Sequence, residues 1–148
     1  MKRIYQILII LTVLTLIPFY GNSQCKSFAK KVCKSELAPY IHDGNFNAAI
    51  LTEGEDAELY KTFYAGQNYR IYICGSDALP DIEFQVLDVN RNVLYDNRKK
   101  DFSRVWDFNL ESSQQLIISL RVKNSEGELD ELLSGCVAIM FGIKEDIE

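Results

Sequence analysis

Leu116-Ile117-Ile118-Ser119-Leu120-Arg121-Val122, residues 116–122, is the stretch that decides the fold class. Apolar side chains recur at every second position from Leu116 to Val122, and Ser119 and Arg121 lie on the opposite side. A period of two with one apolar face is typical of a half-buried strand in an antiparallel sheet. Residues 82–86 and 105–110 repeat this pattern. The chain is therefore expected to contain strands that bury one face and expose the other.

Segments of this kind follow one another along most of the chain. They are residues 48–51, 59–64, 69–74, 82–87, 92–95, 105–110, 116–122 and 136–143. Short turns rich in Gly, Asn and Asp separate them, and residues 65–68 are expected to form a hairpin link. About eight short strands with no helix between them predict an all-β, mainly antiparallel sandwich of jelly-roll type. Residues 24–148 are expected to form this single domain.

One helix is predicted ahead of the strands, at residues 25–38. Its apolar stripe has helical spacing and consists of Cys25, Phe28, Ala29, Val32, Cys33 and Leu37. Pro39 is expected to end the helix, because its ring disfavours helical geometry in the residue before it. Lys26, Lys30 and Lys34 share another face, with Lys31 beside them. We interpret that face as the solvated side of an amphipathic helix, and contact with a partner is the alternative.

The first 23 residues have the pattern of a secretory signal peptide. Lys2 and Arg3 precede a nearly apolar run at residues 4–17, and small residues stand at positions 21 and 23. This run is shorter than the about 20 residues of a membrane span, which disfavours an uncleaved anchor. Gln24 directly before Cys25 disfavours a lipoprotein, because lipid attachment in bacteria normally needs a small residue there. The sequence therefore predicts an exported protein, either periplasmic or extracellular.

The charge of the predicted mature chain restricts its partners. Without Lys2 and Arg3, 14 Lys and Arg residues remain against 21 Asp and Glu residues, a net charge of −7. This balance argues against nucleic acid and against anionic membrane surfaces. No second apolar run of membrane length follows the first, so no membrane span is expected after signal cleavage.

Four cysteines lie downstream of the predicted signal peptide: Cys25, Cys33, Cys74 and Cys136. An even number in an exported chain predicts disulfides, and a zinc site is disfavoured because there is no C-x-x-C pair. Cys25 and Cys33 in one helix would be about 12 Å apart, too far for a bond. We prefer a pattern in which each helix cysteine pairs with one sheet cysteine, with the connectivity unknown. The alternative is Cys74 with Cys136, plus a bridge between Cys25 and Cys33 from a frayed N-terminus.

The run Leu59-Tyr60-Lys61-Thr62-Phe63-Tyr64-Ala65-Gly66-Gln67-Asn68-Tyr69-Arg70-Ile71-Tyr72-Ile73 resembles the opening of bacterial pre-peptidase C-terminal domains. The resemblance continues at residues 84–88 and 93–95, and ends with the strands at 116–120 and 137–141. It covers about residues 50–143. The resemblance implies a small secreted β-sandwich of jelly-roll type with an extracellular binding role. The N-terminal helix and the cysteines depart from the family pattern, and the family's association with a preceding peptidase is not carried over.

Candidate catalytic and metal sites are few. Asp88, Asn90 and Asn92 have the spacing of a calcium loop, but Val93 and Lys99 stand where an EF-hand needs Gly and Glu. A hairpin turn rich in Asp and Asn is the favoured interpretation, so no metal and no cofactor are expected. His42 beside Asp43 has no recognisable nucleophile, and no G-x-S-x-G motif occurs. The chain is therefore not expected to be an enzyme.

Tyrosines give the functional prediction. Tyr60, Tyr64 and Tyr72 alternate along two neighbouring strands and would form a flat aromatic platform if their faces coincide and point outward. Such a surface binds proteins or stacks on sugars, whereas the alternative places these rings in the core. We therefore expect an exported, non-enzymatic module that binds a protein or glycan at the cell envelope or outside the cell. A structural subunit that uses an edge strand is the alternative, and a small hydrolase ranks last.

Overall fold

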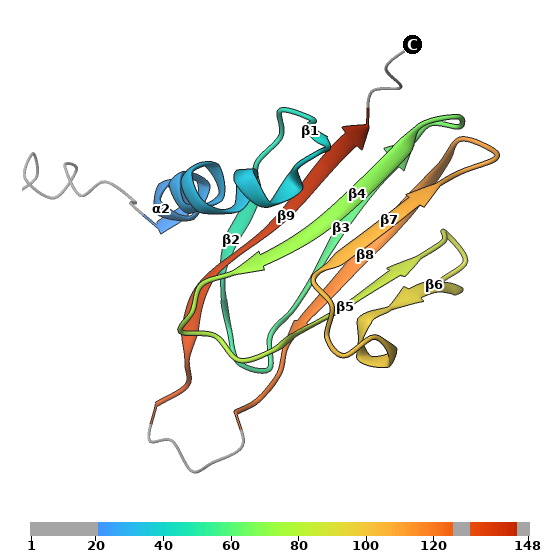
Figure 1. The fold of residues 1–148 in the computed structure, drawn as a ribbon. Helices are drawn as coiled ribbons and strands as arrows, with labels where there is room; N and C mark the ends of the chain where they lie inside the picture. The colour runs from blue at the N-terminus through green and yellow to red at the C-terminus, as the bar shows by residue number, and fades with distance from the viewer. Residues whose placement is uncertain (1–20, 126–130, 145–148) are drawn as a thin grey trace, which may run out of the picture.

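The computed structural model describes residues 21–125 and 131–144. Two antiparallel sheets pack face to face (Figure 1). Sheet A contains β1 (Ile41–His42), β2 (Asn47–Thr52), β4 (Asn68–Gly75), β7 (Val105–Asn109) and β9 (Ser134–Lys144). Sheet B contains β3 (Asp56–Phe63), β5 (Ile82–Leu87), β6 (Val93–Asp96) and β8 (Gln114–Val122). The predicted all-β sandwich is thus confirmed; the signal peptide prediction falls mostly outside the described residues.

Strand order places β9 and β8 at the centre of their sheets. Sheet A runs β1-β9-β4-β7, with β2 also paired to β9, and sheet B runs β3-β8-β5-β6. All eight predicted strand segments coincide with observed strands, and the two-residue β1 was not predicted. The strands alternate as expected, because the side chains that face the other sheet are buried. Phe63, Ile71, Phe84, Leu116, Ile118 and Phe141 are among the most buried residues of this core.

An aromatic stack closes one open side of the sandwich. Tyr95 of β6 stacks on Trp106 of β7 with a centroid distance of 5.1 Å, and Trp106 stacks on Phe108 at 4.2 Å. These contacts join the edge of sheet B to the edge of sheet A. The three rings pack against the main core while remaining partly exposed. Trp106 therefore contributes to the core.

The helical segment begins earlier than predicted and lies on the outer face of sheet A. It consists of α2 (Gly21–Phe28), a π-helical turn η1 (Ala29–Cys33) and a 3₁₀ turn η2 (Lys34–Leu37). It ends at Leu37, because Ala38 before Pro39 is extended, with ψ of 137°. Its buried residues Ala29, Cys33 and Leu37 pack on Ala138 and Met140 of β9. Within the described residues, no helix is long and apolar enough to cross a membrane.

Two disulfides attach this segment to sheet A. Cys25 bonds to Cys136 of β9 with a Cα–Cα distance of 5.2 Å, and Cys33 bonds to Cys74 of β4 with a distance of 5.8 Å. Both bonds therefore join the helix to the sheet, and they place it across β9 and β4. Since the two partner strands are neighbours in sheet A, the bonds also determine how the helix is oriented on the sheet.

The link at residues 65–68 is not a hairpin, which corrects the sequence-based expectation. β3 pairs with β8 in sheet B, whereas β4 pairs with β7 and β9 in sheet A. Gly66 provides the turn with φ of 77°, a conformation that favours glycine. Its N–H donates to the carbonyl of Leu110 instead of closing a ladder between β3 and β4. The chain thus crosses from one sheet to the other at this point.

Candidate functional site

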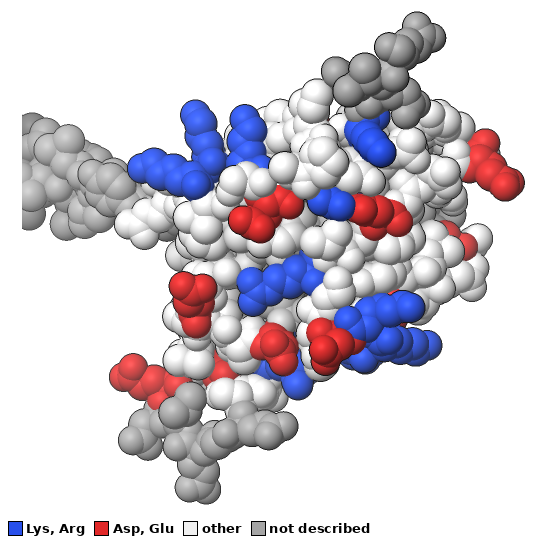
Figure 2. All heavy atoms as spheres, in the orientation of Figure 1, with Lys and Arg blue, Asp and Glu red and all other residues white. Residues whose placement is uncertain are grey.

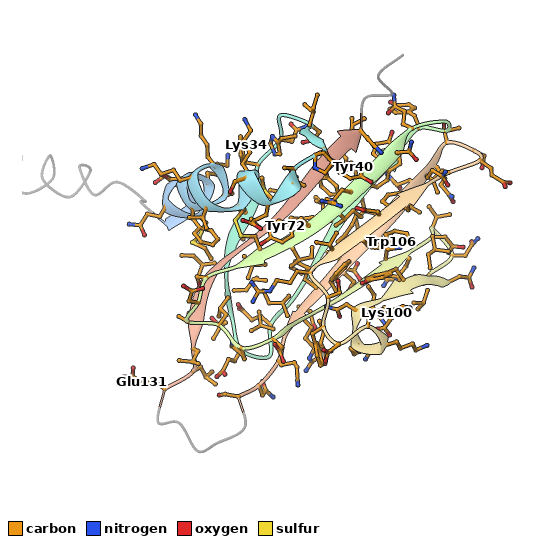
Figure 3. All side chains as sticks on the ribbon, viewed as in Figure 1. Lys34, Tyr40, Tyr72, Lys100, Trp106 and Glu131 are labelled. Atoms are coloured by element: carbon orange, nitrogen blue, oxygen red, sulfur yellow. A yellow bond between two sulfur atoms is a disulfide. The ribbon has the colours of Figure 1, made fainter. Side chains whose placement is uncertain are left out.

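The structure separates the three tyrosines that were predicted to form one platform. Tyr60 and Tyr64 follow the outer side of β3 and are 52% and 62% exposed. Tyr72 lies on the outer face of sheet A, half-buried between β4 and the helical segment (Figure 3). The prediction of one binding face with Tyr60, Tyr64 and Tyr72 is therefore wrong, because β3 and β4 belong to different sheets. Of the three, Tyr60 lies on the outer face of sheet B, at about the middle of the edge strand β3.

That free face, the outer face of sheet B, is called the open face below. Strand register arranges its side chains in rows that run across β3, β8 and β5. One row is charged and contains Asp56, Arg121 and Glu83. The next is polar and contains Glu58, Ser119, Gln85 and Asp96. The third is apolar and contains Tyr60, Ile117 and Leu87. Charge thus gives way to apolar surface along the strand direction.

The apolar row breaks the alternation that defines the fold. Ile117 stands between Leu116 and Ile118, and Leu87 follows Val86, so each occupies an outward position with an apolar side chain. Both are nearly buried, at 3% and 7% exposure, although none of the strands and helices that the structure describes forms a second layer over them. Sequence reasoning did not identify them as site residues. The sequence did contain a sign of these two site residues: each is apolar at a position where the alternation of the strand predicts a polar side chain.

A hydrogen-bonded bridge crosses the apolar row. Arg91 lies in the turn between β5 and β6 and donates from Nη1 and Nη2 to the Glu58 carboxylate, at 2.9 and 3.0 Å. The Tyr60 hydroxyl donates to the same carboxylate at 3.2 Å. The hydrogen bond from Arg91 is the main reason that the pKa of Glu58 lies below its usual value. Glu58 therefore stays ionised at neutral pH and links β3 to the β5–β6 turn.

A polar hollow of about 230 Å³ opens over the charged and polar rows. Its side chains are mostly charged or polar and come from β3, β5, β8 and the start of η3 (Asn97–Lys99): Asp56, Glu83, Gln85, Arg98, Ser119, Leu120 and Arg121. Arg98 donates to Asp96 and holds the pKa of that carboxyl below its usual range. Both signs of charge are present, so the hollow suits the mixed charges of a protein surface better than one uniformly charged ligand.

Much of the outer face of sheet A is covered by other parts of the chain. The helical segment covers β9 and part of β4, and Tyr40 and Arg70 extend this cover beyond its end. The Arg70 guanidinium lies 4.4 Å from the centre of the Tyr40 ring and donates to the Ala38 carbonyl at 3.0 Å. It also makes two 2.7 Å hydrogen bonds with the Asp107 carboxylate. These contacts join the end of the helical segment to β4 and β7.

In the calcium-loop candidate at residues 88–92, the Asp88 carboxylate accepts hydrogen bonds from the loop itself. The Asp88 carboxylate accepts from the backbone N–H groups of Asn90 and Asn92, at 2.8 and 2.9 Å, and from the Asn92 side chain at 2.8 Å. Arg91 takes the left-handed conformation in this turn, with φ of 64°. The described residues contain no group of three His, Cys, Asp or Glu side chains positioned to hold a metal. The observed arrangement is that of an Asx-type hairpin turn.

His42 lies in a buried corner of β1. Its Nδ1 accepts the Gly44 N–H at 3.1 Å, and its ring packs on Phe46 with a centroid distance of 4.4 Å. The Nε2 atom is buried without a hydrogen-bond partner, and the nearest Asp43 oxygen is 3.9 Å away. Burial is the main cause that lowers the pKa of His42, so the ring is neutral at neutral pH. All four cysteines form disulfides, so no thiol is present beside it.

Comparison with known proteins adds one structural likeness. No protein-family model matches the chain, and no curated protein matches it. The fold is similar to the crystal structure of Aeromonas hydrophila PliG, a periplasmic lysozyme inhibitor of g-type lysozyme. The two share 15% sequence identity and a TM-score of 0.49, over 68% of this chain and 85% of that one. At this level the likeness assigns neither function nor site to the chain.

Proposed function

We propose that this chain is an exported, non-enzymatic module that binds a protein partner through the open face. The observation that carries this proposal is that exposed Tyr60 lies in register with the nearly buried Ile117 and Leu87, on a sheet face that no described helix or strand covers, with charged and polar rows beside it. Interfaces between proteins have this anatomy, with an apolar centre and a polar rim. Tyr60 and Arg91 are also of the residue types that dominate binding energy in such interfaces.

Export is supported by the cysteines. Two disulfides form and persist in oxidising compartments, such as the periplasm or the extracellular space, and are rare in the cytosol. Together they tie the helix to sheet A and leave sheet B without a covalent cover. An exported domain of this kind can present the open face continuously, without a conformational change.

Site-specific cross-linking and titration test the open face. A photoreactive residue is placed at position 60 and, as a control, at exposed position 109 on β7; a partner should cross-link from position 60 and not from position 109. Titration of that purified partner should show about 30-fold weaker binding for Tyr60→Ala, the loss expected of a hot-spot tyrosine. Tyr64→Ala is the matched control, because Tyr64 is at least as exposed as Tyr60 but lies beyond the apolar row. Loss with Tyr64→Ala and none with Tyr60→Ala would refute the proposal.

Purified g-type lysozyme is one defined protein for this titration. Inhibition of its activity that is lost in Tyr60→Ala and kept in Tyr64→Ala would identify the class of partner. Absence of inhibition by the wild-type chain would exclude this partner. A partner that proves to be a glycan, with no protein cross-linked from position 60, would overturn the proposed protein-binding role.

A second candidate function is a structural subunit that adds a strand at β2. The edge strands β3, β6 and β7 each carry charged residues, whereas Asn47-Ala48-Ala49-Ile50-Leu51-Thr52 of β2 carries none. Charges on edge strands normally prevent pairing with another chain, so β2 is the edge that could accept one. Ile50→Lys should abolish the association if this function holds, and leave binding through the open face unchanged. Association that survives Ile50→Lys would exclude it.

A further inference from the structure

The helical segment carries a group of lysines on its solvent side, called the lysine ridge below. It consists of Lys26 of α2, Lys30 and Lys31 of η1, and Lys34 of η2, and all four are exposed. Figure 2 shows basic side chains gathered over this part of the surface, and Figure 3 shows Lys34 directed away from the sheet. The ridge belongs to the cover of sheet A, so it is separate from the open face.

The position of the ridge is held by the buried side of the same helix. Cys25, Ala29, Cys33 and Leu37 are at most 1% exposed and face the sheet. Both disulfides start from this side, at Cys25 and Cys33. Because the helix cannot roll on the sheet without breaking them, the lysines must point to solvent. The ridge is therefore a fixed surface rather than a set of side chains that could turn inward.

The ridge lysines have no acidic partners on their own helix or elsewhere in the described chain. Ion pairs hold Lys61, Arg70, Arg91, Arg98 and Arg121, and none of the four ridge lysines takes part in one within the described residues. Lys26 and Lys30, like Lys30 and Lys34, are four residues apart, a spacing at which like charges destabilise a helix. Solubility alone does not account for this arrangement, because an acidic chain gains solubility from carboxylates.

The rest of the chain has the opposite charge. Glu36 is the one acidic residue between Gly21 and Leu37, against four lysines. The remainder of residues 24–148 carries 10 Lys and Arg residues against 20 Asp and Glu residues. A long, flat anionic partner such as a membrane or nucleic acid would be attracted by the ridge and repelled by the rest. A short acidic segment would meet the ridge alone.

From this charge distribution we propose that the lysine ridge is a second docking surface, and that it binds an acidic segment of a partner protein. The ridge consists of four exposed ammonium groups and forms no pocket. It should therefore recognise the charge of a partner rather than its shape. Binding should therefore be fast and sensitive to salt, because exposed charges are screened within about 8 Å at physiological ionic strength. The proposal does not depend on the open face and survives if that face binds nothing.

A decaglutamate peptide with a fluorescent label is the probe. Its affinity for the full chain is measured by fluorescence anisotropy at 25 mM and 250 mM salt. Lys30→Glu/Lys34→Glu should weaken binding at least 10-fold at 25 mM salt. The matched control is Lys99→Glu/Lys100→Glu on and next to η3, which changes the net charge equally at exposed positions away from the helix. The control should change affinity less than 3-fold.

Three outcomes would overturn the proposal. They are equal losses in the two double variants, no binding of decaglutamate to the wild type at 25 mM salt, and tighter binding to vesicles of 70% phosphatidylcholine and 30% phosphatidylglycerol than to the peptide. Lys30→Gln/Lys34→Gln serves as a second variant that removes charge without adding repulsion. It should lose at least 3-fold in affinity while keeping the melting temperature of the wild type.

Discussion

The outer faces of the two sheets differ in what covers them. On sheet A, Met140 and Ala138 lie under a helix that two disulfides fasten down, and Arg70 and Tyr40 extend the cover. On sheet B, Ile117 and Leu87 lie on a face that no helix or strand of residues 21–125 and 131–144 covers, and neighbouring side chains shield them. The difference shows that apolar residues on an outer face have two uses. Under the helix they serve stability, and on the open face they lie in register with exposed Tyr60, to which we assign binding.

Of the changes considered, removal of the disulfides that hold the helix on sheet A should have the largest effect on the free energy of unfolding. Replacement of all four cysteines by serine should lower the free energy of unfolding by about 4–8 kcal/mol, at about 2–4 kcal/mol per bond. The Cys25–Cys136 bond spans 111 residues and the Cys33–Cys74 bond spans 41, so the first should contribute about 1 kcal/mol more. Two double variants, Cys25→Ser/Cys136→Ser and Cys33→Ser/Cys74→Ser, each remove one bond. The difference between their free energies of unfolding, measured in urea, tests this expectation. Trypsin should cut the helix first in both, and uniform protection would contradict the anchoring role.

A pair of alanine substitutions compares the two faces directly. Met140→Ala, under the helix at 0% exposure, should cost about 2–5 kcal/mol of stability through lost burial and a cavity. Tyr60→Ala on the open face should cost less than about 0.5 kcal/mol, since exposed substitutions rarely cost more. Urea midpoints of the two variants test this. Similar losses would mean that the open face is structural and would weaken its assignment to binding.

Replacement of Asn97, at one end of sheet B, is expected to lower the free energy of unfolding by a smaller amount. This buried residue of η3 accepts the Phe84 N–H at 2.8 Å and donates to the Ile82 carbonyl at 2.9 Å, on the side of β5 where its pairing with β6 has ended. Asn97→Ala leaves these backbone groups unpaired and should cost about 1–3 kcal/mol. Asn109→Ala, at an exposed position on β7, is the control and should be near neutral. Equal stability of the two variants would show that water replaces the amide.

The smallest expected effect is the contribution of His42, in β1, to the pH dependence of stability. Burial lowers the pKa of His42 below its ordinary 6.5, so between these two values the unfolded chain binds a proton that the folded chain does not. Stability is therefore complete above about pH 7 and falls as the pH drops below 6.5, by at most about 1.4 kcal/mol per pH unit. His42→Asn should flatten the curve between pH 7 and 5. Parallel curves for the two proteins would show that His42 does not contribute.

Much of the fold could be predicted from the sequence, whereas the candidate site could not. Residues 82–87 were predicted with the bounds that the structure shows, because alternation and its limits are local properties. The error at residues 65–68 had a larger consequence. A turn of four residues with a central glycine serves a hairpin and a crossing between sheets equally well, and only the pairing partners of the two strands distinguish them. Tyr72 was assigned to the wrong face for this reason.

By itself, the sequence determined which side chains alternate, where the turns fall, that a helix at about residues 25–38 precedes the strands and that the chain is acidic apart from the lysines of that helix. These properties depend on neighbours within a few positions along the chain. The tertiary structure decided which sheet each strand joins, which face the helix covers and that Ile117 and Leu87 line up with Tyr60. These depend on contacts between distant residues, which form because two sheets bury a common core, and local periodicity does not specify them.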